Sequence, residues 1–435
     1  MAAKSALPFS VGDELTVRFE TMAASGAGKG TPEGMAVGEC SVFTDRAAPG
    51  DVARVRVTGI KKRFVNADLV EVIEPGPDRV AAPCPVFETC GSCHWQHLTY
   101  DAQLAQKHEV ASYQLKRLID DPSILTPVAP SPSPLGYRVR GELTAVRTGA
   151  TIRLGFRRHR SHDLIQVERC PLFLPGLADR FDAIARALVD RGLAEDQPYR
   201  VRIFLDEATG RIALAAESHE RASYPDVAMV VIDGDGRLVE NPELDERPFS
   251  MAVDGRTIRF HPHCFTQINP AVNERLVADA VETVAPEKGL RVLELYSGIG
   301  NFSIPLAARG AKVLAVESSP VSHPWAEKNA AEHGPLPITH DGRDAFQACR
   351  GLLENDATYD VVFTDPPRVG MGPMVSEIVS LFEARRIVYV SCHPQNLVRD
   401  GLILRAHGYH PTQIRLYDMF PQTFHMESLA VFEKF

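Results

Sequence analysis

The stretch VLELYSGIGNFSIPLA, residues 292 to 307, gives the clearest indication of the fold. Its first residues are apolar enough for a buried strand, and Gly298 and Gly300 follow where the strand would turn into a helix. Glycines at such a turn let a ligand approach the backbone and the helix N-terminus. The segments KVLAVESS, YDVVFTDPP and RIVYVSCHP are also apolar, end in polar residues and are separated by helical patterns. Together they predict a parallel sheet buried between helices.

Ligands of such sheets bind at the carboxyl ends of the strands. We therefore expect one crevice to be lined by the side chains at or near those ends, namely Glu294, Tyr296, Glu317, Asp365 and Cys392. Glu317 follows Gly300 by seventeen residues, and an acid at that place accepts hydrogen bonds from ribose hydroxyls. Ser303 stands where a dinucleotide fingerprint has its third glycine, so the pattern favours S-adenosylmethionine over NAD.

The loop TDPPRVGMG follows the strand that ends at residue 364. Asp365 would lie beside a methyl donor, and the two prolines that follow it stiffen the loop. Arg368 offers a forked donor for a phosphate or a base carbonyl. An aspartate cap followed by a rigid turn would explain Asp365 but not the basic residue.

Cys392 ends the predicted strand in RIVYVSC, residues 386 to 392. A buried cysteine is usually a small hydrophobic residue, but a thiolate beside a methyl donor suits a carbon that must first be made nucleophilic. C5 of uracil is such a carbon, because thiolate addition at C6 activates it. A general base must afterwards remove the C5 proton. Glu427, which opens the last predicted strand, and His425 are both candidates.

Residues 10 to 75 predict a small five-stranded barrel, in which ASGAGKGTPEG is expected to be a glycine-rich loop carrying Lys29. Barrels of this size often hold nucleic acid, although they also serve other roles. Residues 75 to 85 are expected to be a linker.

A cysteine array occupies CPVFETCGSCHWQH, residues 84 to 97, and contains Cys84, Cys90 and Cys93. Three thiols need a fourth ligand for tetrahedral zinc or for an iron–sulfur cube. Cys170, which precedes a proline as Cys84 does, is the first candidate, with His94 or His97 as the alternative. The uneven spacing favours iron and sulfur over zinc.

The net charge of the chain is -9, which argues mildly against a nucleic-acid partner. The segment from residue 137 to 170, however, contains eight arginines and three acidic residues, so its local net charge is +5. A solvated strand face and an RNA-facing surface both explain this segment.

No apolar run reaches the roughly 18 residues of a membrane helix, and the N-terminus lacks the apolar core of a signal peptide, so we expect a cytoplasmic protein with reduced cysteines.

Taken together, these motifs resemble those of the RNA 5-methyluridine methyltransferases, which methylate uridine C5 in bacterial 23S rRNA and in tRNA. The resemblance covers nearly the whole chain and includes FTQIN, LELYSGIGNFS, DPPR, SC-x-P and DMFPQT-x-H-x-E. It implies an α/β protein whose Rossmann-like class I methyltransferase domain spans residues 266–435. An OB-like TRAM barrel that binds RNA would span 1–76. A central α+β domain with the metal cluster would span 77–265, and its helix at 100–119 is expected to pack on the catalytic domain.

The resemblance also implies roles for particular residues. Cys392 would be the nucleophile and Glu427 the base. S-adenosylmethionine would be bound by Gln267, Tyr296, Glu317 and Asp365. A 4Fe-4S cluster with a structural or RNA-positioning role would be held by Cys84, Cys90, Cys93 and Cys170. The implied partner is RNA, with 23S rRNA favoured over tRNA; no DNA or membrane partner is expected, and a monomer is the default.

One departure from the family pattern adjoins the nucleophile, where His393 replaces the usual asparagine. As a cation it would lower the thiol pKa. Two other functions stay open. A non-catalytic RNA-binding protein would not need both Cys392 and Glu427, and an amino-group methyltransferase, which can share a DPP-type loop, needs no cysteine nucleophile.

Overall fold

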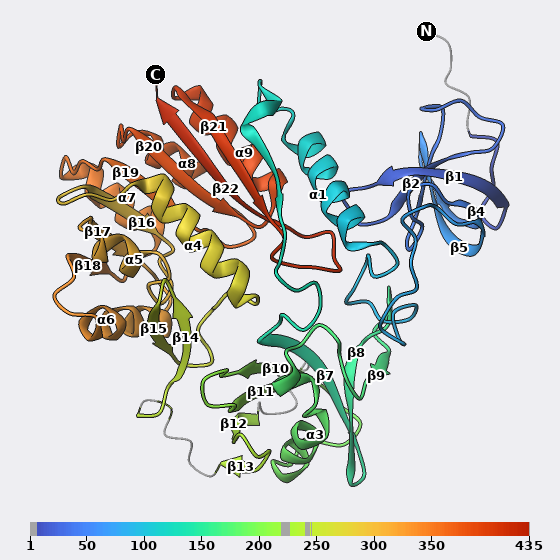
Figure 1. The fold of residues 1–435 in the computed structure, drawn as a ribbon, viewed down its shortest axis with the longest axis horizontal. Coiled ribbons are helices and arrows are strands. Elements are labelled where there is room, and N and C mark those ends of the chain that lie inside the picture. The colour runs from blue at the N-terminus through green and yellow to red at the C-terminus, as the bar shows by residue number, and fades with distance from the viewer. Residues whose placement is uncertain (1–6, 219–226, 240–243, 245, 435) are drawn as a thin grey trace. The chain divides into compact units, whose positions relative to one another are not determined.

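Figure 1 shows the computed structural model of the chain, which describes residues 7–218, 227–239, 244 and 246–434. The chain divides into two compact units. The first comprises Met1–Gln114, Arg158–Arg160 and Phe420–His425; the second comprises Leu115–Arg157, Ser161–Met419 and Met426–Phe435. Nowhere in the described ranges is there a helix with both the length and the apolar character needed to cross a membrane.

The first unit contains the predicted five-stranded barrel, which the structure confirms. Its strands are β1 (Glu14–Met22), β2 (Gly28–Pro32), β3 (Ser41–Thr44), β4 (Val52–Ile60) and β5 (Phe64–Glu74), closed in the order β1-β2-β3-β5-β4. Alternate side chains of β4, such as Val55 and Val57, fill the interior.

The expectation of a glycine-rich loop around Lys29 is wrong, because residues 28–32 form strand β2. Glycine is needed there for close packing. A Cβ atom on Gly30 would lie 2.5 Å from the carbonyl oxygen of Arg18 on the paired strand β1. A glycine-rich sequence is depleted in strand formers, so its pairing could not be foreseen from local preference.

Helix α1 (Tyr100–Leu115) ends four residues earlier than the sequence pattern predicts. Within the first unit, its side chains hold the segment Phe420–His425. The Gln103 and Gln422 side chains are hydrogen-bonded at 3.0 Å, and Lys107 Nζ donates to the carbonyl oxygen of Phe420 at 3.1 Å. Helix α1 and this segment therefore pack together within the first unit.

The second unit contains an antiparallel sheet of seven strands. In spatial order they are β13 (Leu238–Val239), β12 (Val227–Ile232), β11 (Ile212–Ser218), β10 (Pro198–Leu205), β7 (Arg140–Thr148), β8 (Thr151–Arg157) and β9 (Leu164–Gln166). Helix α3 (Phe181–Asp190) buries Ile184 and Leu188 and contacts β8 and β12. The short helix α2 (Pro175–Ala178) precedes α3, and a separate hairpin, β14 (Phe249–Val253) and β15 (Arg256–Phe260), leads out of the sheet.

The C-terminal part of this unit is an eight-stranded sheet, drawn in orange and red in Figure 1 apart from β6. Its order is β18 (Ile338–Asp341), β17 (Lys312–Val316), β16 (Arg291–Leu295), β19 (Val361–Thr364), β20 (Arg386–Ser391), β22 (Glu427–Lys434), β21 (Tyr409–Tyr417) and β6 (Leu125–Ala129). The helices between its strands are α4 (Pro270–Val284), which leads into β16, and α5 (Ser303–Ala308), α6 (Ser322–Glu332), α7 (Ala345–Glu354), α8 (Gly372–Ser380) and α9 (Pro394–Ala406).

Strands β16 to β20 are parallel, which confirms the predicted parallel sheet. Strand β22 runs antiparallel between β20 and β21. Strand β6, preceded by a short 3-10 turn at Pro122–Ile124, was not expected, because prolines follow it closely in the sequence. It lies at the edge of the sheet, where the missing N–H of Pro127 is tolerated.

Candidate active site

The pairing of β20 with β22 brings Cys392 opposite Glu427. Ser391, the last residue of β20, pairs with Ser428, and Ser428 Oγ donates to the carbonyl oxygen of Ser391 at 2.9 Å. The next position along this antiparallel register joins Cys392 and Glu427, which are 35 residues apart in sequence. Cys392 is partly exposed, whereas Glu427 is buried.

Two residues of the loop after β19 complete this group. Asp365 follows the last residue of β19, which is parallel to β20. The guanidinium of Arg368 donates a hydrogen bond to the Cys392 thiol. A thiol, two carboxyls and one arginine therefore lie at one edge of the sheet, after the carboxyl ends of β19 and β20 and at the start of the antiparallel strand β22.

These groups shift one another's ionisation. Burial raises the pKa of Cys392 to about 12; the negative charges of Glu427 and Asp365 add to the rise, and Arg368 opposes it. Burial, then repulsion by Asp365, raises the pKa of Glu427 well above its ordinary value, again against Arg368. Burial raises the pKa of Asp365 as well. Arg368 is thus the charge that favours a Cys392 thiolate.

The loop that carries Arg368 is fixed by helix α9. Asn396 Nδ2 donates to the carbonyl oxygen of Arg368 at 2.6 Å, and Arg399 Nη2 donates to that of Val369 at 2.7 Å. The Asp400 carboxylate accepts from the backbone N–H of Met371 at 2.9 Å. Because these contacts hold the backbone at and just after Arg368, its side chain is presented from a fixed support.

The turn after β16 lies at the carboxyl end of that strand, which pairs in parallel with β19. Tyr296 has a positive φ of 62°, and Gly298 and Gly300 follow with φ of 59° and 98°. Glu317, at the end of β17, accepts from the backbone N–H of Gly298 at 2.9 Å and from that of Ser319 at 2.7 Å. A non-glycine residue in this region is strained, and such strain is common at ligand sites.

Glu294 lies beneath this turn. It is buried within β16 and accepts a hydrogen bond from Ser303 Oγ in the first turn of α5. Burial raises the pKa of Glu294 to about 8. At neutral pH this carboxyl is therefore mostly protonated, and it ties the strand to the helix.

Polar atoms without partners mark the neighbourhood of the predicted cofactor residues. Ser297 Oγ, Thr364 Oγ1 and Thr266 Oγ1 are buried and have no hydrogen-bond partner within the described residues. They adjoin Tyr296, Asp365 and the buried Gln267 in sequence. Buried polar groups are normally paired, so a ligand with several donors and acceptors, such as S-adenosylmethionine, fits this donor set. Sequence reasoning missed these three residues, although each stands next to a predicted site residue.

His393 does not act as the cation considered from the sequence. Burial lowers its pKa, and the charges of Arg368 and Arg399 lower it further. The ring is therefore neutral at pH 7 and supplies no charge that would favour the Cys392 thiolate.

His425, the alternative base, belongs to the first unit. Its ring packs on Phe424, with centroids 4.2 Å apart, and lies 6.2 Å from the His94 ring. Glu427, in contrast, lies in the same unit as Cys392 and acts directly on the pKa of its thiol. The described contacts favour Glu427.

The predicted cluster ligands are buried thiols. Cys84, Cys90 and Cys93 lie in the first unit and Cys170 in the second. The backbone N–H groups of Val86 and Phe87 donate to the Cys84 sulfur. This donor chemistry suits iron and sulfur, although among the residues whose placement is described no group of three His, Cys, Asp or Glu side chains is arranged to hold a metal ion.

The comparisons with known proteins agree with this geometry. Residues 244–435 match the family model described as tRNA (uracil-5-)-methyltransferase. The chain is 31% identical to the 23S rRNA (uracil(1939)-C(5))-methyltransferase RlmD of Alkalilimnicola ehrlichii, over 91% of this chain and 92% of the relative. It is also 31% identical to the enzyme of the same name from Methylococcus capsulatus, over 97% of both chains.

Among solved structures, the chain is similar to the tRNA (uracil-54, C5)-methyltransferase of Pyrococcus abyssi in complex with S-adenosyl-L-homocysteine. The TM-score is 0.70 at 22% identity, over 96% of this chain and 100% of the other. This likeness confirms the class I methyltransferase fold expected from the sequence.

Proposed function

Since this chain belongs to the RNA uracil-C5 methyltransferase family, we propose that it methylates C5 of a uridine in RNA with S-adenosylmethionine as the methyl donor. The observation that carries the proposal is the meeting of Cys392, Glu427, Asp365 and Arg368 at the strand ends. A methyltransferase acting on amino groups would have no use for a thiol opposite a carboxyl.

The reaction begins with addition of the Cys392 thiolate to C6 of the uracil. A C–S bond forms, and the electron pair of the C5–C6 double bond moves toward C5 and the C4 carbonyl oxygen. Arg368 favours this step because it lowers the pKa of the thiol. The target base must leave its stack to reach Cys392.

When bound, S-adenosylmethionine supplies the methyl group to C5. We propose that Gln267, Tyr296, Glu317 and Asp365 hold it. The unpartnered polar atoms of Ser297, Thr364 and Thr266 support this placement, since they adjoin those residues.

Glu427 then removes the remaining proton from C5. The electrons of the C5–H bond rebuild the C5–C6 double bond, and the C–S bond breaks to release Cys392. The burial that raises the pKa of Glu427 also makes its carboxylate a stronger base than an exposed one. The effect of its charge on the Cys392 thiol supports its action on the same uracil.

We propose 23S rRNA as the substrate, because both full-length relatives act on it by name. An RNA of this kind also implies a cytoplasmic location. The test is methyl transfer from labelled S-adenosylmethionine to unmodified 23S rRNA and tRNA transcripts, followed by mass spectrometry of the nucleosides. The expected product is 5-methyluridine in 23S rRNA alone. Methylation of tRNA would reassign the substrate, and methylated amino groups would reject the mechanism.

We further propose that Cys84, Cys90, Cys93 and Cys170 hold a 4Fe-4S cluster with a structural role. Methyl transfer through a thiol adduct moves no electrons to or from the protein, so the cluster need not change its oxidation state. Soft thiolates buried from water are suitable ligands.

Anaerobically purified protein is therefore expected to be brown and to contain iron and acid-labile sulfide. Replacing Cys90 by serine should remove the colour and lower the melting temperature, whereas Cys349→Ser, which changes a buried thiol outside the array, should keep the colour. A colourless wild-type protein that contains zinc would show that the metal is not iron.

The Arg368→Gln variant should have a less reactive Cys392 thiol than the wild type. Removing the guanidinium raises the thiol pKa further, so the thiolate fraction near pH 7 falls. A hydrogen bond to a charged group contributes about 1.5–3 kcal/mol, so kcat/KM should fall about tenfold to a hundredfold. The rate at which iodoacetamide alkylates Cys392, followed by mass spectrometry of its peptide, should fall by a similar factor. A loss of kcat/KM with an unchanged alkylation rate would mean that Arg368 acts on the RNA and not on the thiol.

A further inference from the structure

A cavity of about 550 Å³ lies within the second unit, and none of the four predicted cofactor residues lines it. Strands β7, β10 and β11 form one wall, and residues 262–265 with Ile268 form another. Arg368 lines it too, and the same side chain hydrogen-bonds to Cys392. The cavity therefore begins where the target base would sit.

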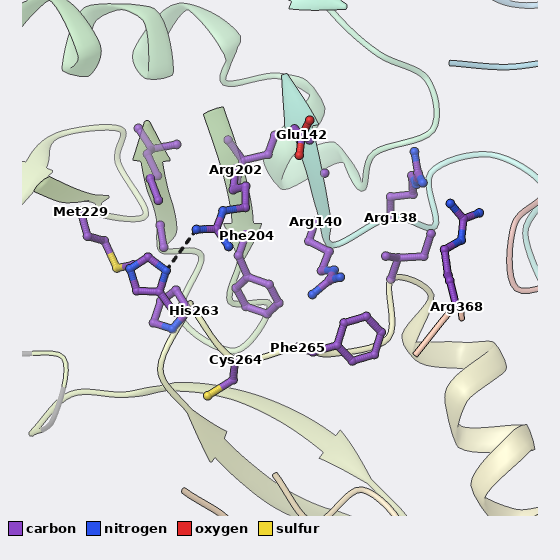
Figure 2. A pocket seen from close by; sticks show the side chains of 17 residues that line it. Arg138, Arg140, Glu142, Arg202, Phe204, Met229, His263, Cys264, Phe265 and Arg368 are labelled. Atoms are coloured by element: carbon purple, nitrogen blue, oxygen red, sulfur yellow. Dashed lines mark hydrogen bonds between the residues drawn. The ribbon is translucent and has the colours of Figure 1, made fainter. Parts of the chain in front are cut away.

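The charges lining this cavity are unbalanced. Four arginines face it, namely Arg138, Arg140, Arg202 and Arg368, against the single acid Glu142. Glu142 itself is ion-paired at 3.4 Å with Arg200, which does not line the cavity. Arg202 pairs with Glu217 and also hydrogen-bonds to His263 at 3.4 Å, as the dashed line in Figure 2 shows.

Arg140 is the most distinctive of these residues. Its guanidinium lies over the Phe265 ring, 4.6 Å from the centroid, and Figure 2 shows the two side chains together between Arg202 and Arg368. The Phe265 ring is 60% exposed. Burial lowers the pKa of Arg140 to about 10, and the charges of Arg138 and Arg202 add to the decrease. A positive charge withdrawn from water among like charges is stabilised by an incoming anion.

We propose that this cavity binds the nucleotide next to the target uridine, with its phosphate on Arg140 and its base against Phe265. This inference rests on the proposed function and names a substrate contact beyond it. Arginine forks match phosphate oxygens, and an exposed aromatic ring offers a face on which an unstacked base can lie. Arg138 and Arg140 belong to the arginine-rich segment 137–170, so at least part of that segment would face RNA.

The test compares RNA binding by the wild type and Arg140→Gln over a range of KCl concentrations, with a 23S rRNA fragment as the probe. Removing one contact to a single-stranded phosphate should reduce the slope of log K against log salt by about 0.7. The affinity at low salt should fall about tenfold, while S-adenosylmethionine binding, which also reports folding, should be unchanged.

The matched control is Arg237→Gln. Arg237 lies in the turn between β12 and β13 of the same sheet and does not line the cavity, and its replacement removes the same charge. It should keep the wild-type slope. Arg140→Lys retains the charge and should therefore show the wild-type slope of log K against log salt. Its RNA affinity should stay below that of the wild type, because an ammonium group does not reproduce the forked donors of a guanidinium.

A wild-type slope for Arg140→Gln would overturn the inference. Its failure can be told apart from that of the proposed function. If the wild type produced no 5-methyluridine in any RNA while Arg140→Gln still flattened the salt dependence, the cavity would remain an RNA site and the reaction would be wrong. If the wild type produced 5-methyluridine and Arg140→Gln bound RNA with the wild-type salt dependence, the proposed reaction would stand and the cavity would not be an RNA site.

Discussion

Replacing Cys392 by alanine is expected to lower kcat by a factor of roughly 10⁴ or more. Without the thiol no bond forms at C6, so C5 never becomes nucleophilic. The other groups of the site stay in place, and S-adenosylmethionine should still bind. The expected effect is large because, in the proposed reaction, Cys392 makes the covalent bond to the substrate, a role that no neighbouring residue can supply.

The measurement is a denaturing gel after incubation with S-adenosylmethionine and a 23S rRNA fragment that carries 5-fluorouridine. Fluorine at C5 cannot leave as a proton does, so the wild type should give a slow protein–RNA band that Cys392→Ala lacks. Cys40→Ala removes a buried thiol of the barrel and should keep the band. A Cys392→Ala variant that methylates RNA at the wild-type rate would favour amino-group methylation.

Replacing Glu427 by glutamine is expected to stop the reaction one step later. The neutral amide keeps the shape of the side chain but cannot remove the C5 proton, and the loss of a general base costs about 10²–10⁴ in rate. Addition and methyl transfer should still occur, because the charge of Glu427 raises the thiol pKa and its removal favours the thiolate. The methylated adduct should therefore accumulate with ordinary uridine.

The same gel, run without fluorinated RNA, tests this. A slow band should appear for Glu427→Gln and be weak or absent for the wild type. Glu433→Gln lies on the same strand, where it loses only the ion pair with Arg386 at 2.6 Å, and should turn over normally. If Glu427→Gln lost turnover without any adduct, Glu427 would act before methyl transfer and His425 would need testing as the base.

The parallel sheet and the crevice were predictable because their evidence is local. Buried parallel strands are continuously apolar, and strands of this kind end in polar residues at the ligand side. Cys392 and Asp365 could therefore be placed at strand ends from their own neighbours in sequence. The barrel followed from the same kind of pattern, except for β2, whose glycines are explained only by the close approach of β1.

Local patterns were enough to predict the fold class, the ends of the parallel strands and the residue types of the site, since each depends on apolar runs and turns a few residues long. Tertiary structure decided which of those residues meet. The β20–β22 register places Glu427 against Cys392, helix α9 fixes the loop of Arg368, and the walls of the arginine cavity come from strands and loops far apart in the chain. Strand register and side-chain contact depend on long-range pairing, which no local pattern encodes.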